Sequence, residues 1–184
     1  MSLRLRVPRL AAGLAIGTAV AIIVSGAAYA ITSNVFRYSA PQAGWVSIDE
    51  AALNPGTATQ TYTRNYTNSS LGAGQAGCFQ TGVNLPNGAR LTALKASYQS
   101  TGAASQTFLL FRRNINTGAG AFIVTGDSAN TGSAPASANF PVPAPMAVVN
   151  NKAFAYGFAV CFPGTSALGF FSARISYTYT VAGS

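Results

Sequence analysis

Bulky and small side chains alternate along much of the chain after residue 30. In Lys152–Phe162, large apolar side chains would share one face of an extended segment and small ones the other. The large set is Phe154, Tyr156, Phe158, Val160 and Phe162. A period of two is the pattern of a β-strand. We therefore predict a strand here, and we expect a second layer of the domain to pack closely on its small-residue face.

Similar segments recur along the chain, separated by turns rich in glycine, proline and asparagine. The other predicted strands cover residues 34–39, 44–48, 59–67, 78–84, 90–99, 106–113, 119–125 and 168–181. Residues 127–139 are predicted to form a polar loop. Residues 140–146 are predicted to form an edge strand or connector, since alternate prolines cannot donate to a ladder. These features predict an all-β fold, an antiparallel two-sheet sandwich with jelly-roll connectivity.

The first 30 residues have the three parts of a secretion signal. Three arginines in residues 1–9 precede the apolar run Leu10–Val24, and Ala28-Tyr29-Ala30 supplies a small-residue cleavage site. This order favours a signal peptide over residues 1–30 and a single sandwich domain over residues 31–184. The alternative is an uncleaved anchor, because Leu10–Ile31 is long enough to span a bilayer as a helix. In both cases we expect a secreted, extracellular or cell-surface domain, with membrane contact only through the N-terminal segment if it is uncleaved.

The chain has two cysteines, Cys78 and Cys161, and both lie in the exported part. Two such residues usually pair in an oxidising compartment. A nucleophilic thiol would need a base, and the sequence contains no histidine. We therefore predict a disulfide between Cys78 and Cys161.

Charged residues make up only 8% of the chain, against about 25% in a typical soluble domain. Beyond the leader, eight basic residues outnumber three acidic ones, which gives the domain a net charge of +5. The basic residues are spread along the sequence rather than gathered in a tract. Nucleic acid is therefore not an expected partner, whereas a weak attraction to anionic envelope polymers fits the charge.

The residue types needed for common enzyme mechanisms are missing. Without histidine, serine and cysteine triads cannot form. Glycoside hydrolysis uses two carboxylates in one cleft, and the only acidic residues are Asp49, Glu50 and Asp127. The first two would point to opposite faces of a strand. We predict no catalytic residues, no metal site, no cofactor and no enzymatic activity.

Several segments resemble a group of uncharacterised secreted bacterial β-domains. They are CFQTGVNLPNGARLTALKASY at 78–98, TFLLFRR at 107–113, KAFAYGFAV at 152–160 and ARISYTYT at 173–180. The resemblance covers most of residues 36–180. It implies a secreted β-sandwich and brings no known activity, so it assigns no functional residues.

Two functions remain open at this point. The first is a non-enzymatic structural or interaction domain of the cell envelope, with an envelope glycan or protein as partner and with self-association as a further option. The second is a carbohydrate-binding module, since such modules bind sugars with exposed aromatic rings. The candidate ligand-contact residues are Trp45, Tyr62 and Tyr66, although most aromatic residues of a sandwich lie in its core.

Overall fold

A computed structural model describes residues 36–65, 70–72, 75–101, 104–164 and 168–182. The leader and Tyr66 lie outside this range, so the predicted signal peptide and its alternative remain predictions. Within the described part, no helix has the length and apolar character needed to cross a membrane. The strands belong to one compact unit, Arg37–Ser184.

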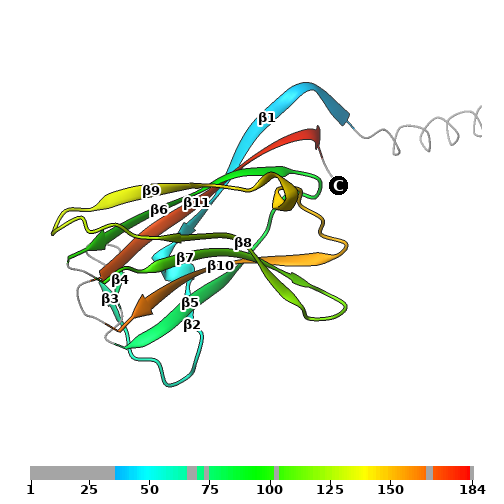
Figure 1. The fold of residues 1–184 in the computed structure, drawn as a ribbon. Coiled ribbons are helices and arrows are strands. Elements are labelled where there is room, and N and C mark those ends of the chain that lie inside the picture. Colours follow the sequence, from blue (N-terminus) through cyan, green and yellow to red (C-terminus); the bar gives the residue numbers. More distant parts are fainter. Residues whose placement is uncertain (1–35, 66–69, 73–74, 102–103, 165–167, 183–184) are drawn as a thin grey trace, which may run out of the picture. The chain divides into compact units, whose positions relative to one another are not determined.

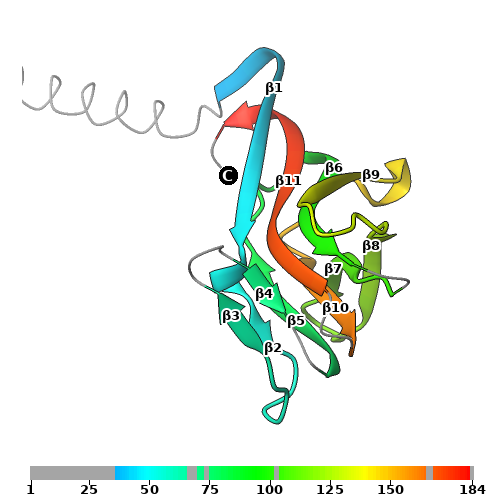
Figure 2. The same ribbon diagram turned by 90° about the vertical axis from the view of Figure 1, so that its left-hand side faces the viewer.

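The described residues form two antiparallel sheets (Figures 1 and 2). The six-stranded sheet has the order β3-β4-β11-β6-β9, with β1 also paired to β11, and the five-stranded sheet has the order β2-β5-β10-β7-β8. The strands of the first are β1 Phe36–Asp49, β3 Thr63–Asn65, β4 Ser70–Gly72, β6 Arg90–Ser100, β9 Ala136–Pro141 and β11 Leu168–Ala182. Those of the second are β2 Asn54–Pro55, β5 Ala76–Val83, β7 Thr107–Asn114, β8 Gly120–Asp127 and β10 Phe154–Pro163. The two 3₁₀ turns are η1 Glu50–Ala52 and η2 Ala144–Met146.

The chain crosses repeatedly from one sheet to the other. β4, β6, β9 and β11 lie in one sheet, while β5, β7, β8 and β10 lie in the other. This gives two four-strand blocks, β4-β11-β6-β9 and β5-β10-β7-β8, which is the arrangement of a jelly roll. The predicted sandwich and its connectivity are confirmed.

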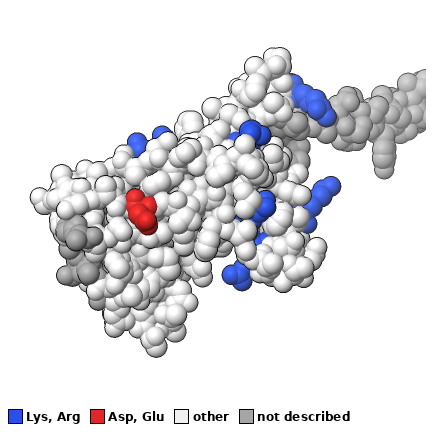
Figure 3. Space-filling model, viewed as in Figure 1, with Lys and Arg blue, Asp and Glu red and all other residues white. Residues whose placement is uncertain are grey.

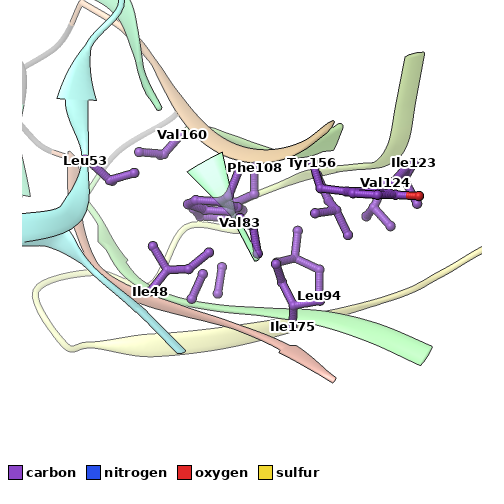
Figure 4. Close-up of a cluster of buried hydrophobic side chains, with 14 of the residues drawn as sticks. Ile48, Leu53, Val83, Leu94, Phe108, Ile123, Val124, Tyr156, Val160 and Ile175 are labelled. Carbon is purple, nitrogen blue, oxygen red and sulfur yellow. The ribbon is translucent and has the colours of Figure 1, made fainter. Parts of the chain in front are cut away.

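Large apolar side chains from both sheets fill the space between them (Figure 4). Phe158 of β10 and Phe170 of β11 have no exposed surface, and their ring centroids lie 5.6 Å apart across the two layers. Phe108 of β7 reaches Tyr98 of β6 in the same way, at 5.4 Å. Burying each such ring stabilises the fold by roughly 2–3 kcal/mol. The bulky face of β10 is therefore committed to this core.

The structure differs from the predicted strand boundaries in three places. Residues 34–39 and 44–48 were expected to be two strands, but β1 is one strand from Phe36 to Asp49. It contains Pro41, which an edge strand tolerates. The loop predicted at 127–139 ends early, because β9 begins at Ala136, and the strand predicted at 59–67 begins only at Thr63, with β3. The proline-rich segment is an edge strand only as far as Pro141 and then turns through η2, in line with its predicted edge position.

Candidate functional site

The side of β10 that faces away from the core carries only small side chains. Its bulky residues are buried in the core, so Ala155, Gly157, Ala159 and Cys161 point outward. The expectation that a second layer packs on these small residues is wrong, because the second layer covers the bulky face. The small residues instead form the floor of an exposed surface. We call this surface, made by the outward side chains of β5, β10, β7 and β8, the groove face.

A row of aromatic rings crosses the groove face. The strand register aligns Gly82, Gly157, Phe111 and Phe122 across β5, β10, β7 and β8. The Phe111 ring lies against Gly157 so closely that a Cβ atom at position 157 would overlap it. Phe122 is 62% exposed. Solvent-facing rings that lie side by side are an apolar surface of the kind that often marks a binding site.

Two shallow hollows adjoin this aromatic row. One has a volume of about 290 Å³ and is bordered by Leu109 and Phe122, and the other, of about 450 Å³, is bordered by Asn54 and Gly157. Gln80, Phe111 and Arg113 line both. These three residues therefore stand where the two hollows meet.

Polar side chains lie on either side of the rings. Gln80 is exposed and its strand register pairs it with Asn54 of β2, so two amide side chains occupy one edge of the groove face. Arg113 is exposed at the end of β7, whereas its neighbour Arg112 points to the other side and stacks on the Phe154 ring at 4.3 Å. An amide both donates and accepts hydrogen bonds, and a guanidinium donates up to five. The groove face thus combines rings with groups that can bond hydroxyls.

The predicted disulfide closes one end of this surface. Cys78 of β5 and Cys161 of β10 are directly opposite in the register, with Cα atoms 3.9 Å apart, and their sulfur atoms are bonded. The next pair in the same row is Thr107 and Asp127, where the Thr107 hydroxyl donates to the Asp127 carboxylate at 2.6 Å. The row therefore joins all four strands of the groove face by covalent and hydrogen bonds.

Of the three aromatic residues predicted from sequence, neither Trp45 nor Tyr62 lies on the groove face. Trp45 is 63% exposed on β1 of the six-stranded sheet. Tyr62 is 42% exposed, but its ring packs edge-on against the buried Phe79 at 5.2 Å, with the Arg64 guanidinium 5.7 Å from its centroid. Tyr66 lies outside the described residues. Tyr62 therefore helps to cover the core, and Trp45 belongs to a different surface.

The acidic residues are distributed between the two sheets. Asp49 ends β1 and caps η1 by accepting a hydrogen bond from the Ala51 amide at 2.9 Å, while Asp127 ends β8. Glu50 is only 2% exposed. Its hydrogen bond to Asp49 and its burial raise the pKa of Glu50, and the same hydrogen bond, with the Ala51 amide, lowers the pKa of Asp49. Among the described residues, no three His, Cys, Asp or Glu side chains form a group that could hold a metal ion.

The groove residues could have been recognised from one sequence signal. The segment 106–113 is apolar on both faces, which predicts a strand covered on both sides. β10, its neighbour, offers only small residues on the outward side. If no layer covers that side, Leu109 and Phe111 must be exposed, as they partly are. The position of Phe122 depends on a register shift next to Leu110, and no sequence pattern shows such a shift.

No family model matches the chain, and no curated protein is significantly similar to it in sequence. Its similarity to known proteins is therefore a similarity of structure. The β-sandwich fold that the sequence resemblance implied is confirmed. No family match supports membership of the group of secreted bacterial β-domains that the sequence resembles.

Solved structures share the fold. The C-terminal CBM6 of LamC, a marine laminarinase from Zobellia galactanivorans, superposes with a TM-score of 0.50 at 11% identity, over 72% of this chain and 98% of that one. An exo-β-1,3-galactanase from Phanerochaete chrysosporium has a TM-score of 0.46 at 12% identity, over 72% of this chain and 29% of that one. A family 29 carbohydrate-binding module from Piromyces equi gives 0.43 at 10% identity, over 74% of this chain and 91% of that one. The first of these likenesses shows that the chain has the same β-sandwich fold as a carbohydrate-binding module.

Proposed function

We propose that this protein is a non-catalytic glycan-binding domain that works outside the cytoplasm and holds its ligand on the groove face. The observation that carries the proposal is the row of the half-buried Phe111 and the exposed Phe122 beside the amide of Gln80 and the guanidinium of Arg113. The disulfide is typical of an oxidising compartment. The fold shared with a carbohydrate-binding module is consistent with the same assignment.

The chemistry of a sugar fits this surface. A pyranose ring has an apolar C–H face that can stack on an aromatic ring, and its edges carry hydroxyl groups. Phe111 and Phe122 supply the rings, while Gln80, Asn54 and Arg113 supply donors and acceptors beside them. Binding sites generally combine an apolar lining with a few polar groups that fix orientation. Because the two hollows are shallow and share three lining residues, the ligand class that we propose is an extended glycan chain rather than a single sugar.

The alternative is a structural or interaction domain that uses the same rings to contact a protein, including a second copy of itself. The partner would then bury the side chain of Phe122, which is 62% exposed in the free domain. The two functions differ in what the rings require. A glycan needs the amides of Gln80 and Asn54 as well as the rings, whereas an apolar protein contact depends mainly on Phe122.

A glycan array followed by calorimetric titration of the best oligosaccharide tests the proposal. Phe122→Ala should weaken binding at least tenfold, which corresponds to about 1.4 kcal/mol, because a stacking surface is removed. Gln80→Ala should weaken it by a similar factor through lost hydrogen bonds. Val148→Ala is the matched control, because Val148 is also an exposed apolar residue, at 52%, but lies away from the groove face.

Absence of any glycan ligand, together with a concentration-dependent dimer that Phe122→Ala abolishes, would overturn the proposal in favour of self-association. Light scattering coupled to size-exclusion chromatography measures that dimer directly. Retained oligosaccharide affinity in both Phe122→Ala and Gln80→Ala would also contradict the groove face as the binding surface.

A further inference from the structure

The outward side of the six-stranded sheet carries two cations next to each other. Lys95 of β6 and Arg174 of β11 are directly opposite in the strand register, and both are exposed. The whole chain has only three acidic residues, and none forms an ion pair with either cation in the part that the structure describes. In Figure 3, basic atoms are scattered over the view, some at its upper edge and others toward the right, and the acidic atoms in view lie apart from them.

This arrangement does not serve the fold. Like charges directly opposite each other on neighbouring strands are destabilising. Charged residues often protect the edge of a sheet from pairing with other chains, but β6 and β11 are inner strands of the order β3-β4-β11-β6-β9. Neither ion pairing nor protection of a sheet edge therefore explains why these two like charges lie side by side in a chain with so few charged residues.

Hydroxyl groups surround the cation pair. Ser172, Ser97 and Ser137 form one row across β11, β6 and β9, and Arg174, Lys95 and Asn139 form the adjacent row. Ser47 of β1 joins them around a shallow hollow of about 330 Å³. No hydroxyl of these serines bonds another protein group within the described residues. We call the surface formed by Lys95, Arg174, Ser47, Ser97, Ser172 and Asn139 the cationic face.

An exposed tryptophan lies at the border of the cationic face. Trp45 and Ser47 are two residues apart on β1, so both point to the outward side, while Val46 and Ile48 pack on the core. Trp45 is 63% exposed, although its ring is the largest apolar surface that a side chain can offer. The sequence selected Trp45 as a ligand contact, and the structure places it two residues from Ser47, which lines the hollow of the cationic face, rather than on the groove face with Phe122.

We propose that the cationic face binds a sulfated polysaccharide. A sulfate ester presents three terminal oxygens, which can accept hydrogen bonds from Arg174, from Lys95 and from a serine hydroxyl at the same time. The acceptor sites of a carboxylate lie in one plane, whereas the three oxygens of a sulfate ester point in different directions and so suit donors that come from separate strands. The sugar ring that carries the sulfate would stack on Trp45. This site lies on the other sheet from the groove face, so it does not depend on the function proposed there.

Binding of three polymers with one backbone tests the proposal. Dextran, carboxymethyl dextran and dextran sulfate, the last two matched in length and charge density, are titrated onto the purified protein by biolayer interferometry in about 0.15 M salt. Dextran sulfate should bind at least tenfold more tightly than carboxymethyl dextran, and dextran should show no binding at this face. The double variant Lys95→Gln/Arg174→Gln should lose at least tenfold in affinity for dextran sulfate.

A second double variant, Arg37→Gln/Lys152→Gln, removes the same net charge from two exposed residues away from this hollow. Its affinity should change less than threefold. Trp45→Ala should weaken binding by a factor that persists at high salt, because stacking is not screened. Removing the cation pair should also raise the melting temperature slightly, since the repulsion disappears.

Equal losses in the two double variants would overturn the proposal, because the attraction would then come from net charge alone. Equal or tighter binding of carboxymethyl dextran would overturn the assignment to sulfate. Phe122→Ala should leave dextran sulfate binding unchanged. The proposal for the cationic face can therefore fail while glycan binding at the groove face holds, and the reverse is also true.

Discussion

Glu50, the first residue of η1, is a buried acid. It is 2% exposed, and its neighbour Asp49 accepts its hydrogen bond. A carboxyl group in such a place holds its proton more strongly than in the unfolded chain, so its pKa is raised from 4.5. Asp49 shifts the opposite way, and its pKa is lowered from 3.8. The two residues make the stability of the domain depend on pH in opposite directions.

The sign of each effect follows from which state holds the proton. The contribution of Glu50 is fully present below about pH 4.5 and is lost as the pH rises through its raised folded value. The contribution of Asp49 is present above pH 3.8 and is lost as the pH falls through its lowered folded value. The pair should therefore favour the folded state most strongly near pH 4.

We predict that Glu50→Gln removes the decline in stability on the alkaline side. The amide still donates to Asp49 but has no proton to release, so the free energy of unfolding should no longer fall as the pH rises above about 4.5. Urea unfolding at intervals across this range measures the effect. Parallel profiles for the wild-type protein and the variant would contradict the assignment.

At the scale of a single strand, β10 joins the core to the groove face. Its bulky side points inward and its small side points outward, and Phe111 of β7 occupies the space above Gly157. A glycine is needed there because a larger residue would displace the ring, which has no other layer to pack against. This contact also links stability to binding, because Phe111 borders both hollows and a substitution that displaces its ring would change their shape.

We predict that Gly157→Ala destabilises the domain by about 1–2 kcal/mol through overpacking and weakens oligosaccharide binding. Gly82→Ala is the matched control. Gly82 lies in the same row and pairs directly with Gly157, yet a Cβ atom there would meet nothing within 4 Å. It should be neutral or stabilising by up to about 0.5–1 kcal/mol. Chemical unfolding of both variants decides the matter, and equal destabilisation would show that the ring contact is not the cause.

The alternation in β10 was enough to predict the strand, its bulky face and, with similar segments, the two-sheet sandwich. It could not show which face the second layer covers, because both small and bulky faces are found at sheet interfaces. The site was harder to predict. The sequence around Trp45 and Tyr62 does not show which ring is exposed. Only tertiary packing places Tyr62 on Phe79 and leaves Trp45 exposed. Phe111 and Phe122 meet only through the pairing of β7 with β8.

At the scale of the whole domain, the jelly-roll order brings distant segments together. β5 and β10 are neighbours in one sheet, although four strands lie between them in sequence. Both proposed binding surfaces depend on such pairings, since β6 and β11 carry the cationic face. Because few residues are charged, the polar surface of the domain consists mainly of amides and hydroxyls, with aromatic rings and a few cations among them.

The disulfide is the one covalent link across this topology, and it joins residues 83 positions apart. A loop of that length restricts the unfolded chain strongly, so we predict that Cys78→Ala/Cys161→Ala lowers the free energy of unfolding by about 2–5 kcal/mol. Because Cys78 is exposed, dithiothreitol should reach the bond and lower the stability of the wild-type protein by a similar amount, while the double variant should not respond. Guanidinium unfolding with and without reductant measures both effects, with a thiol assay to confirm reduction. If the fully reduced wild-type protein unfolded at the same denaturant concentration as the oxidised form, packing alone would be holding β5 against β10.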